Sequence, residues 1–249
     1  MGEVTHQTAN LLLASNPKNR TAALILAAGD SRRMGGKTSK QFLALGGIPV
    51  LAHTLLAYQQ SPLITEIIIA AKESDVDTVV ALCEDYHITK LTAVVIGGKS
   101  RQESALRAFS VIGPDIRYVA IADGARCLTT PTEIEMVCGA AYRKKAASAG
   151  VRMTGTVKQV SGRGAVLATL DRETIWEAQT PQVFHIGLYA AAQSRAASDG
   201  FTGTDDNELI EHLGYRIQMV ECSRENLKVT TPDDLRLAAA ILAARRKAK

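Results

Sequence analysis

The chain has 249 residues, a length that suits one large domain or two small ones. Its 46% hydrophobic and 22% charged residues describe a globular protein with enough apolar material for a sizeable core. The net charge of +4 fits a protein that handles phosphates but falls short of a duplex-binding protein. With no aromatic-basic module either, nucleic acid is excluded as a partner.

Other function classes are excluded by residue placement. The cysteines are scattered, with no CxxC pair and no histidine at metal spacing, so they predict reduced thiols in a cytoplasmic protein (Cys83, Cys127, Cys138 and Cys222). The longest early apolar run, residues 11–14, is too short for a signal peptide or a membrane span. Residues 1–20 are polar and aperiodic, and we expect a loose extension ahead of a single domain over residues 21–249.

Short apolar runs alternate with helical patterns from Ala22 onward. The strands that these runs predict span residues 22–28, 66–71, 93–96, 118–122, 217–220 and 227–230. Between them, a helical face is expected from the spacing of Val76, Val79, Val80 and Cys83. Strand and helix alternating in this way predict an α/β fold with a doubly wound, mostly parallel, Rossmann-like sheet.

Three helix starts are marked by capping residues. Thr130 and Ser100 are each followed three positions later by a glutamate, the spacing of a capping box. Pro232, directly after Thr231, suits the first position of a helix.

One segment departs from the α/β rhythm. Between about residues 150 and 172, the short β segments 156–160 and 165–169 flank a Ser-Gly-Arg-Gly turn. This pattern predicts a β-hairpin arm that projects from the sheet and covers either the site or a partner subunit, with a plain surface decoration as the alternative.

The strongest chemical signal follows the first predicted strand. A loop of small residues begins at Ala27, Ala28 and Gly29, and cations cluster through Arg33 to Lys40. Ligands of open α/β sheets bind outside the carboxyl ends of the strands, and backbone N–H groups with cations suit phosphate oxygens. The loop matches neither GxxxxGK[ST] nor GxGxxG, which disfavours ordinary ATPases and Rossmann oxidoreductases. On spacing alone, a glycine-rich surface turn with solvated cations explains it as well.

The loop resembles the signature of the 2-C-methyl-D-erythritol 4-phosphate cytidylyltransferase family, through Ala27-Ala28-Gly29, Arg32-Arg33-Met34 and Lys40-Gln41-Phe42. Further family motifs follow in order: Gly97-Gly98 with Arg101 and Ser104, Asp123-Gly124-Ala125-Arg126, Thr156-Val157-Lys158, Asp171-Arg172, Thr180-Pro181-Gln182, Thr204-Asp205-Asp206 and Asn226-Leu227-Lys228. The resemblance covers residues 22–245. It implies a nucleotidyltransferase sheet and transfer of a cytidylyl group from CTP to 2-C-methyl-D-erythritol 4-phosphate, with release of pyrophosphate, in non-mevalonate isoprenoid biosynthesis.

The resemblance also implies residue roles. Arg33, Lys40 and Lys228 are the expected catalytic cations. For Lys37 the alternatives are a third phosphate contact and a solvated loop charge, of which we favour the second. Phosphoryl-type transfer needs mainly positioning and charge stabilisation, so no covalent nucleophile is expected. The nucleotide is expected to contact Ala27, Ala28, Gly29, Gly98, Ser104, Asp123 and Gly124. Asp123 is also the expected protein ligand of Mg²⁺ or another divalent cation.

The polyol phosphate acceptor is expected to bind five further residues: Arg126, Thr156, Arg172, Thr180 and Thr204. The family contributes some of these across a dimer interface, so a homodimer through the hairpin arm is expected. Asp123 with Arg126 has the spacing of an ordinary structural ion pair, but its position at the carboxyl end of a predicted strand favours a functional role. Without the resemblance, the threonines and Arg172 are ordinary surface residues.

The chain departs from the family pattern at two motifs. Ala122 and Cys127 stand where the family usually has histidine and proline, and Gly155 stands where it usually has aspartate. The alternatives are a ribitol-5-phosphate cytidylyltransferase, a sugar-1-phosphate nucleotidyltransferase and a non-catalytic nucleotide-binding protein. Lys158 after Thr156 favours methylerythritol phosphate over ribitol phosphate, and the presence of both Arg33 and Lys40 disfavours the non-catalytic alternative.

Overall fold

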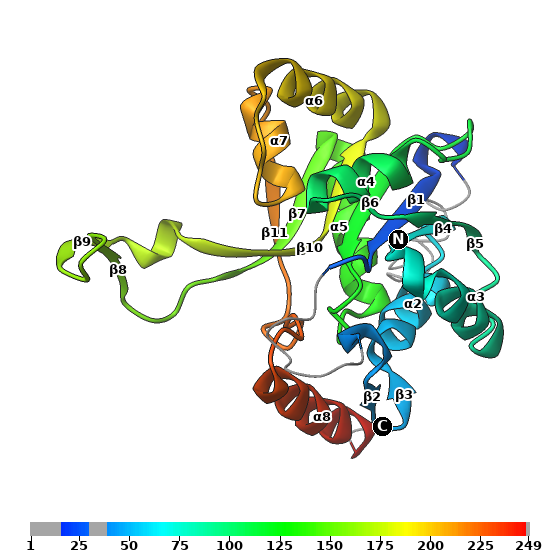
Figure 1. Cartoon of the computed structure of the whole chain (residues 1–249). Coiled ribbons are helices and arrows are strands. Elements are labelled where there is room, and N and C mark those ends of the chain that lie inside the picture. Colours follow the sequence, from blue (N-terminus) through cyan, green and yellow to red (C-terminus); the bar gives the residue numbers. More distant parts are fainter. Residues whose placement is uncertain (1–15, 30–38, 248–249) are drawn as a thin grey trace, which may run out of the picture.

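A computed structural model describes residues 16–29 and 39–247 of the chain. Its centre is a seven-stranded sheet in the order β11-β7-β10-β6-β1-β4-β5 (Figure 1). The strands are β1 (Thr21–Leu26), β4 (Ile64–Ala71), β5 (Leu91–Ile96), β6 (Tyr118–Asp123), β7 (Ala146–Arg152), β10 (Trp176–His185) and β11 (Gln218–Glu221). β1 pairs in parallel with both β4 and β6, whereas β10 runs antiparallel to β6 and β7. The prediction of a mostly parallel, doubly wound sheet is confirmed.

Helices cover both faces of the sheet because its central strands are apolar on both sides. Along β1, Ala23 and Ile25 pack with one set of helices, and Ala22 and Leu24 pack with the other. The first set comprises α2 (Val50–Gln60), α3 (Val76–Asp85) and α5 (Pro131–Lys144). The second set comprises α4 (Arg101–Phe109), α6 (Ile186–Asp199) and α7 (Asp206–His212). No helix within the described ranges is long and apolar enough to span a membrane.

Most predicted strands lie where the apolar runs placed them, but one prediction is wrong. Residues 227–230 form no strand. The N–H of Val229 donates one backbone hydrogen bond, at 2.9 Å, to the carbonyl of Ala125 in the turn after β6. A single hydrogen bond does not form a β-ladder, so residues 227–230 are not paired as a strand.

Two strands of the seven-stranded sheet, β7 and β10, are absent from the strands predicted from the sequence. β7 is rich in alanine, serine and glycine, residues that favour strands weakly, and it forms because it is buried between β10 and β11. The helix predicted from Val76 is present as α3, but Val80 is exposed and the buried residues are Val79, Leu82 and Cys83.

The predicted helix starts are confirmed. Thr130 and Glu133 form a complete capping box at α5. The Ser100 hydroxyl caps α4 by accepting from the N–H of Glu103, whose carboxylate accepts from the N–H of Lys99 one residue before the cap. Pro232 is the first residue of α8 (Pro232–Lys247).

A small apolar cluster lies apart from the two faces of the sheet. This third cluster joins α8 to the hairpin of β2 (Ala44–Leu45) and β3 (Ile48–Pro49) and to the turn after β6. Its buried members are Leu45, Val50, Cys127, Leu128, Val229 and Ala238. Figure 1 shows α8 beside β2 and β3, below the sheet.

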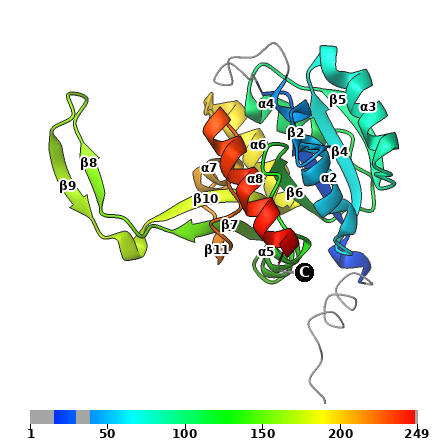
Figure 2. The same ribbon diagram turned by 90° about the horizontal axis from the view of Figure 1, so that it is seen from below.

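The predicted hairpin arm is present. β8 (Val157–Val160) and β9 (Val166–Leu170) pair antiparallel and extend away from the body where β7 and β10 leave the sheet (Figure 2). The 3₁₀ turn η5 (Arg172–Thr174) leads back to β10. Of the predicted N-terminal extension, residues 1–15 lie outside the described residues. Its remainder contains the 3₁₀ turn η1 (Pro17–Asn19), and the carbonyl of Arg20 accepts from the N–H groups of Arg117 and Tyr118.

Candidate active site

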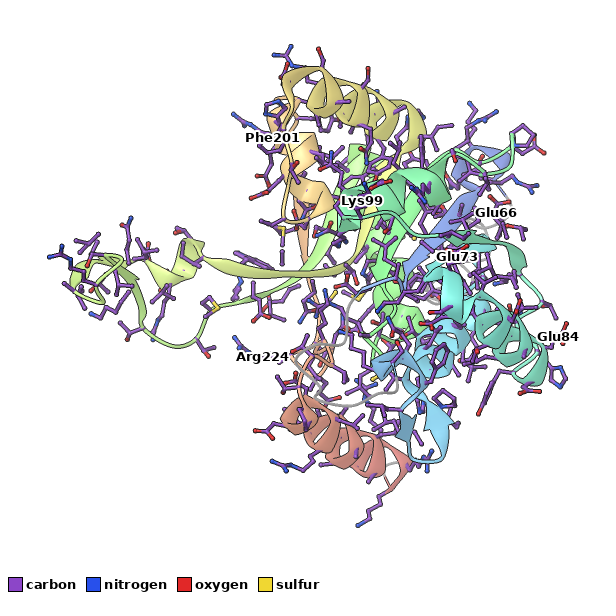
Figure 3. All side chains as sticks on the ribbon, in the orientation of Figure 1. Glu66, Glu73, Glu84, Lys99, Phe201 and Arg224 are labelled. Atoms are coloured by element: carbon purple, nitrogen blue, oxygen red, sulfur yellow. The ribbon has the colours of Figure 1, made fainter. Side chains whose placement is uncertain are left out.

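A cavity of about 810 Å³ lies at the carboxyl edge of the sheet, beyond the ends of β1, β5 and β6. Five cationic and two anionic side chains line it: Lys40, Lys72, Lys99, Arg101, Lys228, Glu73 and Asp123. Figure 3 labels two of them, Lys99 before α4 and Glu73 after β4. Because cations outnumber anions, this cavity suits a polyanionic ligand such as a nucleoside triphosphate.

Asp123 is the electrostatic centre of the cavity wall. It ends β6, and three cations surround its buried carboxylate. Lys228 Nζ lies 2.9 Å from Oδ2, Arg126 Nε lies 3.5 Å from Oδ2, and Arg101 Nε lies 3.5 Å from Oδ1. Burial alone would raise the pKa of Asp123, but Lys228, Arg101 and Arg126 together lower that pKa to about 2. Asp123 is therefore a carboxylate at any physiological pH.

Lys40 and Lys228, two of the predicted catalytic cations, both face this cavity. Lys40 begins the 3₁₀ turn η3 (Lys40–Phe42), and its Nζ donates to the carbonyl of Val229 at 2.9 Å. The neighbouring residue Lys228 pairs with Asp123. The third predicted cation, Arg33, and the predicted solvated Lys37 lie outside the described residues.

The predicted nucleotide residues lie close together. Ala28, Gly29, Gly98 and Ser104 line the cavity with Asp123. The Ser104 hydroxyl accepts from the N–H of Gly98 at 3.0 Å and donates to the carbonyl of Ser100 at 2.8 Å. The loop after β5 approaches the first loop closely, since a Cβ on Gly97 would lie 2.3 Å from the Cβ of Ala28.

Ala27 and Gly124 lie just behind the lining. The N–H of Ala27 donates to the carbonyl of Ala70 at 2.8 Å, and the N–H of Gly124 donates to the carbonyl of Leu26 at 2.9 Å. These bonds extend the pairing of β1 with β4 and with β6 by one residue each. Ala27 and Gly124 therefore fix the backbone behind the residues that line the cavity.

Two predicted acceptor residues, Arg126 and Thr180, are buried beside Asp123. Arg126 Nη1 donates to the carbonyl of Asn226 at 2.6 Å, which fixes the segment that carries Lys228. The Thr180 hydroxyl accepts from the N–H of Asp123 at 3.1 Å. In this structure both side chains are bonded to protein groups and support the carboxylate.

The other predicted acceptor residues do not line this cavity. Thr204 is exposed, and its N–H donates to the Glu208 carboxylate at 2.6 Å. Thr156 and Arg172 are exposed on the arm, where Arg172 Nη1 donates to the carbonyl of Thr154 at 3.0 Å. A single chain therefore does not bring the arm residues to its own cavity.

Asp123 is the candidate protein ligand for a magnesium ion in this cavity. No group of three or more His, Cys, Asp or Glu side chains within the described residues is placed to hold a metal ion. Asp123 offers one carboxylate, and cations face both of its oxygens. A magnesium ion here would take most of its ligands from phosphate oxygens and water, and the Asp123 carboxylate would exchange a cation partner for the ion.

Sequence reasoning gave no role to two residues that the structure places at the site. Arg101, the first residue of α4, lies between Asp123 and the carboxylate of Asp206, with which its Nη1 forms an ion pair. Both residues occur in family motifs. Their pairing spans 105 positions of the chain, so no local pattern reveals it.

An open, mostly parallel sheet with a cationic cavity at its carboxyl edge defines a nucleotide-binding protein of the Rossmann-like nucleotidyltransferase class. Comparison with known proteins narrows this class. The profile of the 2-C-methyl-D-erythritol 4-phosphate cytidylyltransferase (IspD) family matches residues 21–244. This chain belongs to that family.

Individual relatives agree in sequence and structure. The chain is 42% identical over 226 residues to the 2-C-methyl-D-erythritol 4-phosphate cytidylyltransferase of Syntrophus aciditrophicus, covering 90% of this chain and 97% of that protein. It is 40% identical over 222 residues to the enzyme of the same name from Halalkalibacterium halodurans, covering 89% and 96%. The crystal structure of 4-diphosphocytidyl-2C-methyl-D-erythritol synthase from Anaerococcus prevotii superposes with a TM-score of 0.81 at 26% identity, covering 91% of this chain and 99% of that one.

Proposed function

We propose that this chain transfers the cytidylyl group of CTP to 2-C-methyl-D-erythritol 4-phosphate, in isoprenoid precursor biosynthesis. A phosphate oxygen of the acceptor attacks the α-phosphorus of CTP, and the bond to the β-phosphate bridging oxygen breaks. The products are the CDP-linked polyol and pyrophosphate. The observation that carries the proposal is the convergence of Lys40, Lys228 and Asp123 on one cavity in a chain of this family.

Positioned charge accounts for the proposed chemistry. Negative charge that develops on the α-phosphate is stabilised by Lys40, which is held by its hydrogen bond to Val229, and by Arg33, the second cation that the family motif assigns to this role. Lys228 is paired with Asp123 and holds its ammonium at the cavity, where it binds substrate phosphate. No proton transfer by a side chain is needed because a phosphate oxygen is already a nucleophile.

A divalent cation completes the proposed site. We propose magnesium, carried mainly by the triphosphate and with Asp123 as its protein ligand, because Mg²⁺ prefers carboxylate and phosphate oxygens. The ion would neutralise part of the triphosphate charge. We also propose a cytoplasmic location, since CTP and the acceptor are soluble metabolites.

Nucleotide and acceptor choice test the proposal directly. We expect pyrophosphate release with CTP to exceed that with ATP or GTP by more than an order of magnitude, because hydrogen-bonding sites reject ligands that leave their groups unpaired. The measurement is pyrophosphate release from each of four nucleoside triphosphates with methylerythritol phosphate or ribitol 5-phosphate. Equal rates with ATP contradict a cytidylyltransferase, faster turnover of ribitol 5-phosphate changes the acceptor, and no turnover of any pair favours a non-catalytic protein.

We propose a homodimer in which the arm packs against a second subunit. On the arm, Val166 and Leu167 are 61% and 63% exposed, an arrangement that costs solvation free energy in a lone chain. We expect two-fold dimers by sedimentation at micromolar concentration, and a shift toward monomers for Leu167→Glu. Leu237→Glu, at an α8 leucine that is 54% exposed, is the matched control and should remain dimeric.

The dimer also accounts for the predicted arm residues. Thr156 and Arg172 lie away from the cavity of their own chain, so they bind acceptor only in the cavity of a partner. Monomeric wild-type protein with full activity would contradict both the dimer and this role.

A further inference from the structure

Arg101 crosses the cavity wall between two carboxylates. Its Nε lies 3.5 Å from Asp123 Oδ1, and its Nη1 is paired with Asp206 Oδ2. The side chain is 26% exposed and lines the cavity. The guanidinium is thus held by two carboxylates at the cavity, where it can also donate to a ligand oxygen.

Asp206 is held rigidly and is fully buried. It is the first residue of α7, and its N–H donates to the side-chain oxygen of Gln182 at 3.0 Å. The Tyr189 hydroxyl donates to Asp206 Oδ1 at 2.7 Å, and the Gln193 amide donates to the same hydroxyl at 2.7 Å. Burial and the neighbouring Asp206 raise the pKa of Tyr189 well above its usual value, so Tyr189 remains a neutral donor.

This network fixes one rotamer of a long, flexible side chain. The carboxylates of Asp206 and Asp123 pair with different nitrogens of Arg101, and the Tyr189 side chain that holds Asp206 is fully buried. An arginine that is already paired at two nitrogens loses little further entropy when it binds a ligand. Without Asp206, the guanidinium would be free to turn fully onto Asp123.

We propose that Asp206 is a positioning residue: it holds the Arg101 guanidinium beside Asp123, where the guanidinium donates to an oxygen of the bound nucleotide. Arg101 lines the cavity together with Ser104 and Asp123, two of the expected nucleotide residues, so the ligand oxygen proposed for it belongs to the nucleotide. This inference rests on the proposed use of CTP and adds Arg101 and Asp206 to the nucleotide-binding machinery.

Asp206→Asn tests the proposal because it keeps the shape of the side chain and removes its charge. We expect the KM for CTP to rise at least tenfold and kcat to fall, with the KM for methylerythritol phosphate within twofold of wild type. Arg101→Gln should give the same split. If Asp206 acts through Arg101, the double variant has the CTP KM of Arg101→Gln alone, because there is no guanidinium left to position.

In the same set of variants, the melting temperature and the KM for CTP should change independently of each other. Arg101→Gln leaves the buried Asp206 carboxylate unpaired, and we expect its melting temperature to fall by roughly 5–10 °C. Adding Asp206→Asn removes that charge and should recover most of the lost stability without recovering CTP affinity. Substitutions that only weakened the start of α7 would not restore stability while CTP affinity stayed low.

Asp205→Asn is the matched control. Asp205 caps the same helix and accepts from Gln182 and Asn207, but it does not touch Arg101. Its substitution should lower the melting temperature and leave the KM for CTP unchanged. Wild-type kinetics in Asp206→Asn, or KM effects of the two single variants that multiply in the double variant, would overturn the proposal. Wild-type protein that fails to turn over CTP would instead refute the proposed function.

Discussion

Replacing Lys40 with methionine is expected to lower kcat by about 10²–10³, the usual loss when one preorganised donor to a developing charge is removed. Lys40 lines the cavity from a buried position, and methionine preserves most of its packing. CTP binding is shared with backbone N–H groups and other cations, so the KM for CTP should change less than kcat. Steady-state kinetics with a circular dichroism check of folding measures both.

Two variants of the first loop complete this experiment. Arg33→Ala should resemble the Lys40 variant, as the family resemblance implies. Lys37→Ala should remain near wild type, because we interpret Lys37 as solvated loop charge. A crippled Lys37 variant beside active Lys40 and Arg33 variants would show that the wrong cations were assigned to the α-phosphate. A large rise in KM at unchanged kcat would mean that these cations bind substrate and transition state equally.

Asp123→Asn is expected to reduce both activity and stability, because it leaves Lys228, Arg101 and Arg126 without their shared counter-charge. The pKa of Asp123 is lowered from 3.8 to about 2 in the folded protein. At about 1.4 kcal/mol for each pKa unit, ionised Asp123 contributes about 2 kcal/mol to stability. Since the folded pKa is below the unfolded one, this contribution is present above about pH 4 and is lost as the pH falls toward 2.

Urea denaturation from pH 7 to pH 3 measures this contribution. The gap in unfolding free energy between wild type and Asp123→Asn should be constant at neutral pH and begin to close below about pH 4. Asp199→Asn is the control, since Asp199 pairs with Arg195 and His212 at the surface and should have little effect. Wild-type turnover by the Asp123→Asn protein would show that Asp123 has no role in the reaction.

The fold was predictable where apolar runs were long and strand-like. β4 is rich in isoleucine and shows itself by composition alone. β7 does not, because its Ala-Ala-Ser-Ala-Gly sequence becomes a strand only through burial between two neighbours. The reverse error at residues 227–230 has the same origin: Leu227 and Val229 are apolar because they pack in the third cluster, not because they pair in a sheet.

The site was predictable as a set of motifs but not as a network. Motif order placed Asp123, Lys40 and Lys228 in one site, and the structure brings them to one cavity. Sequence could not show that Arg126 and Thr180 turn inward to support Asp123, because both bonds depend on the tertiary packing of β10 and of the segment at Asn226. The pairing of Arg101 with Asp206 escaped for the same reason.

The residues that line the cavity are attached to two different apolar units, the third cluster and the main sheet. Lys40 and Lys228 are attached to this small cluster through Val229, whereas Asp123 and Arg101 are attached to the main sheet. A small apolar unit opens locally at a lower free energy than a large core. A ligand that bridges both walls must raise the free energy of that local opening. The packing of α8, which contributes no described residue to the cavity lining, is therefore thermodynamically linked to ligand affinity.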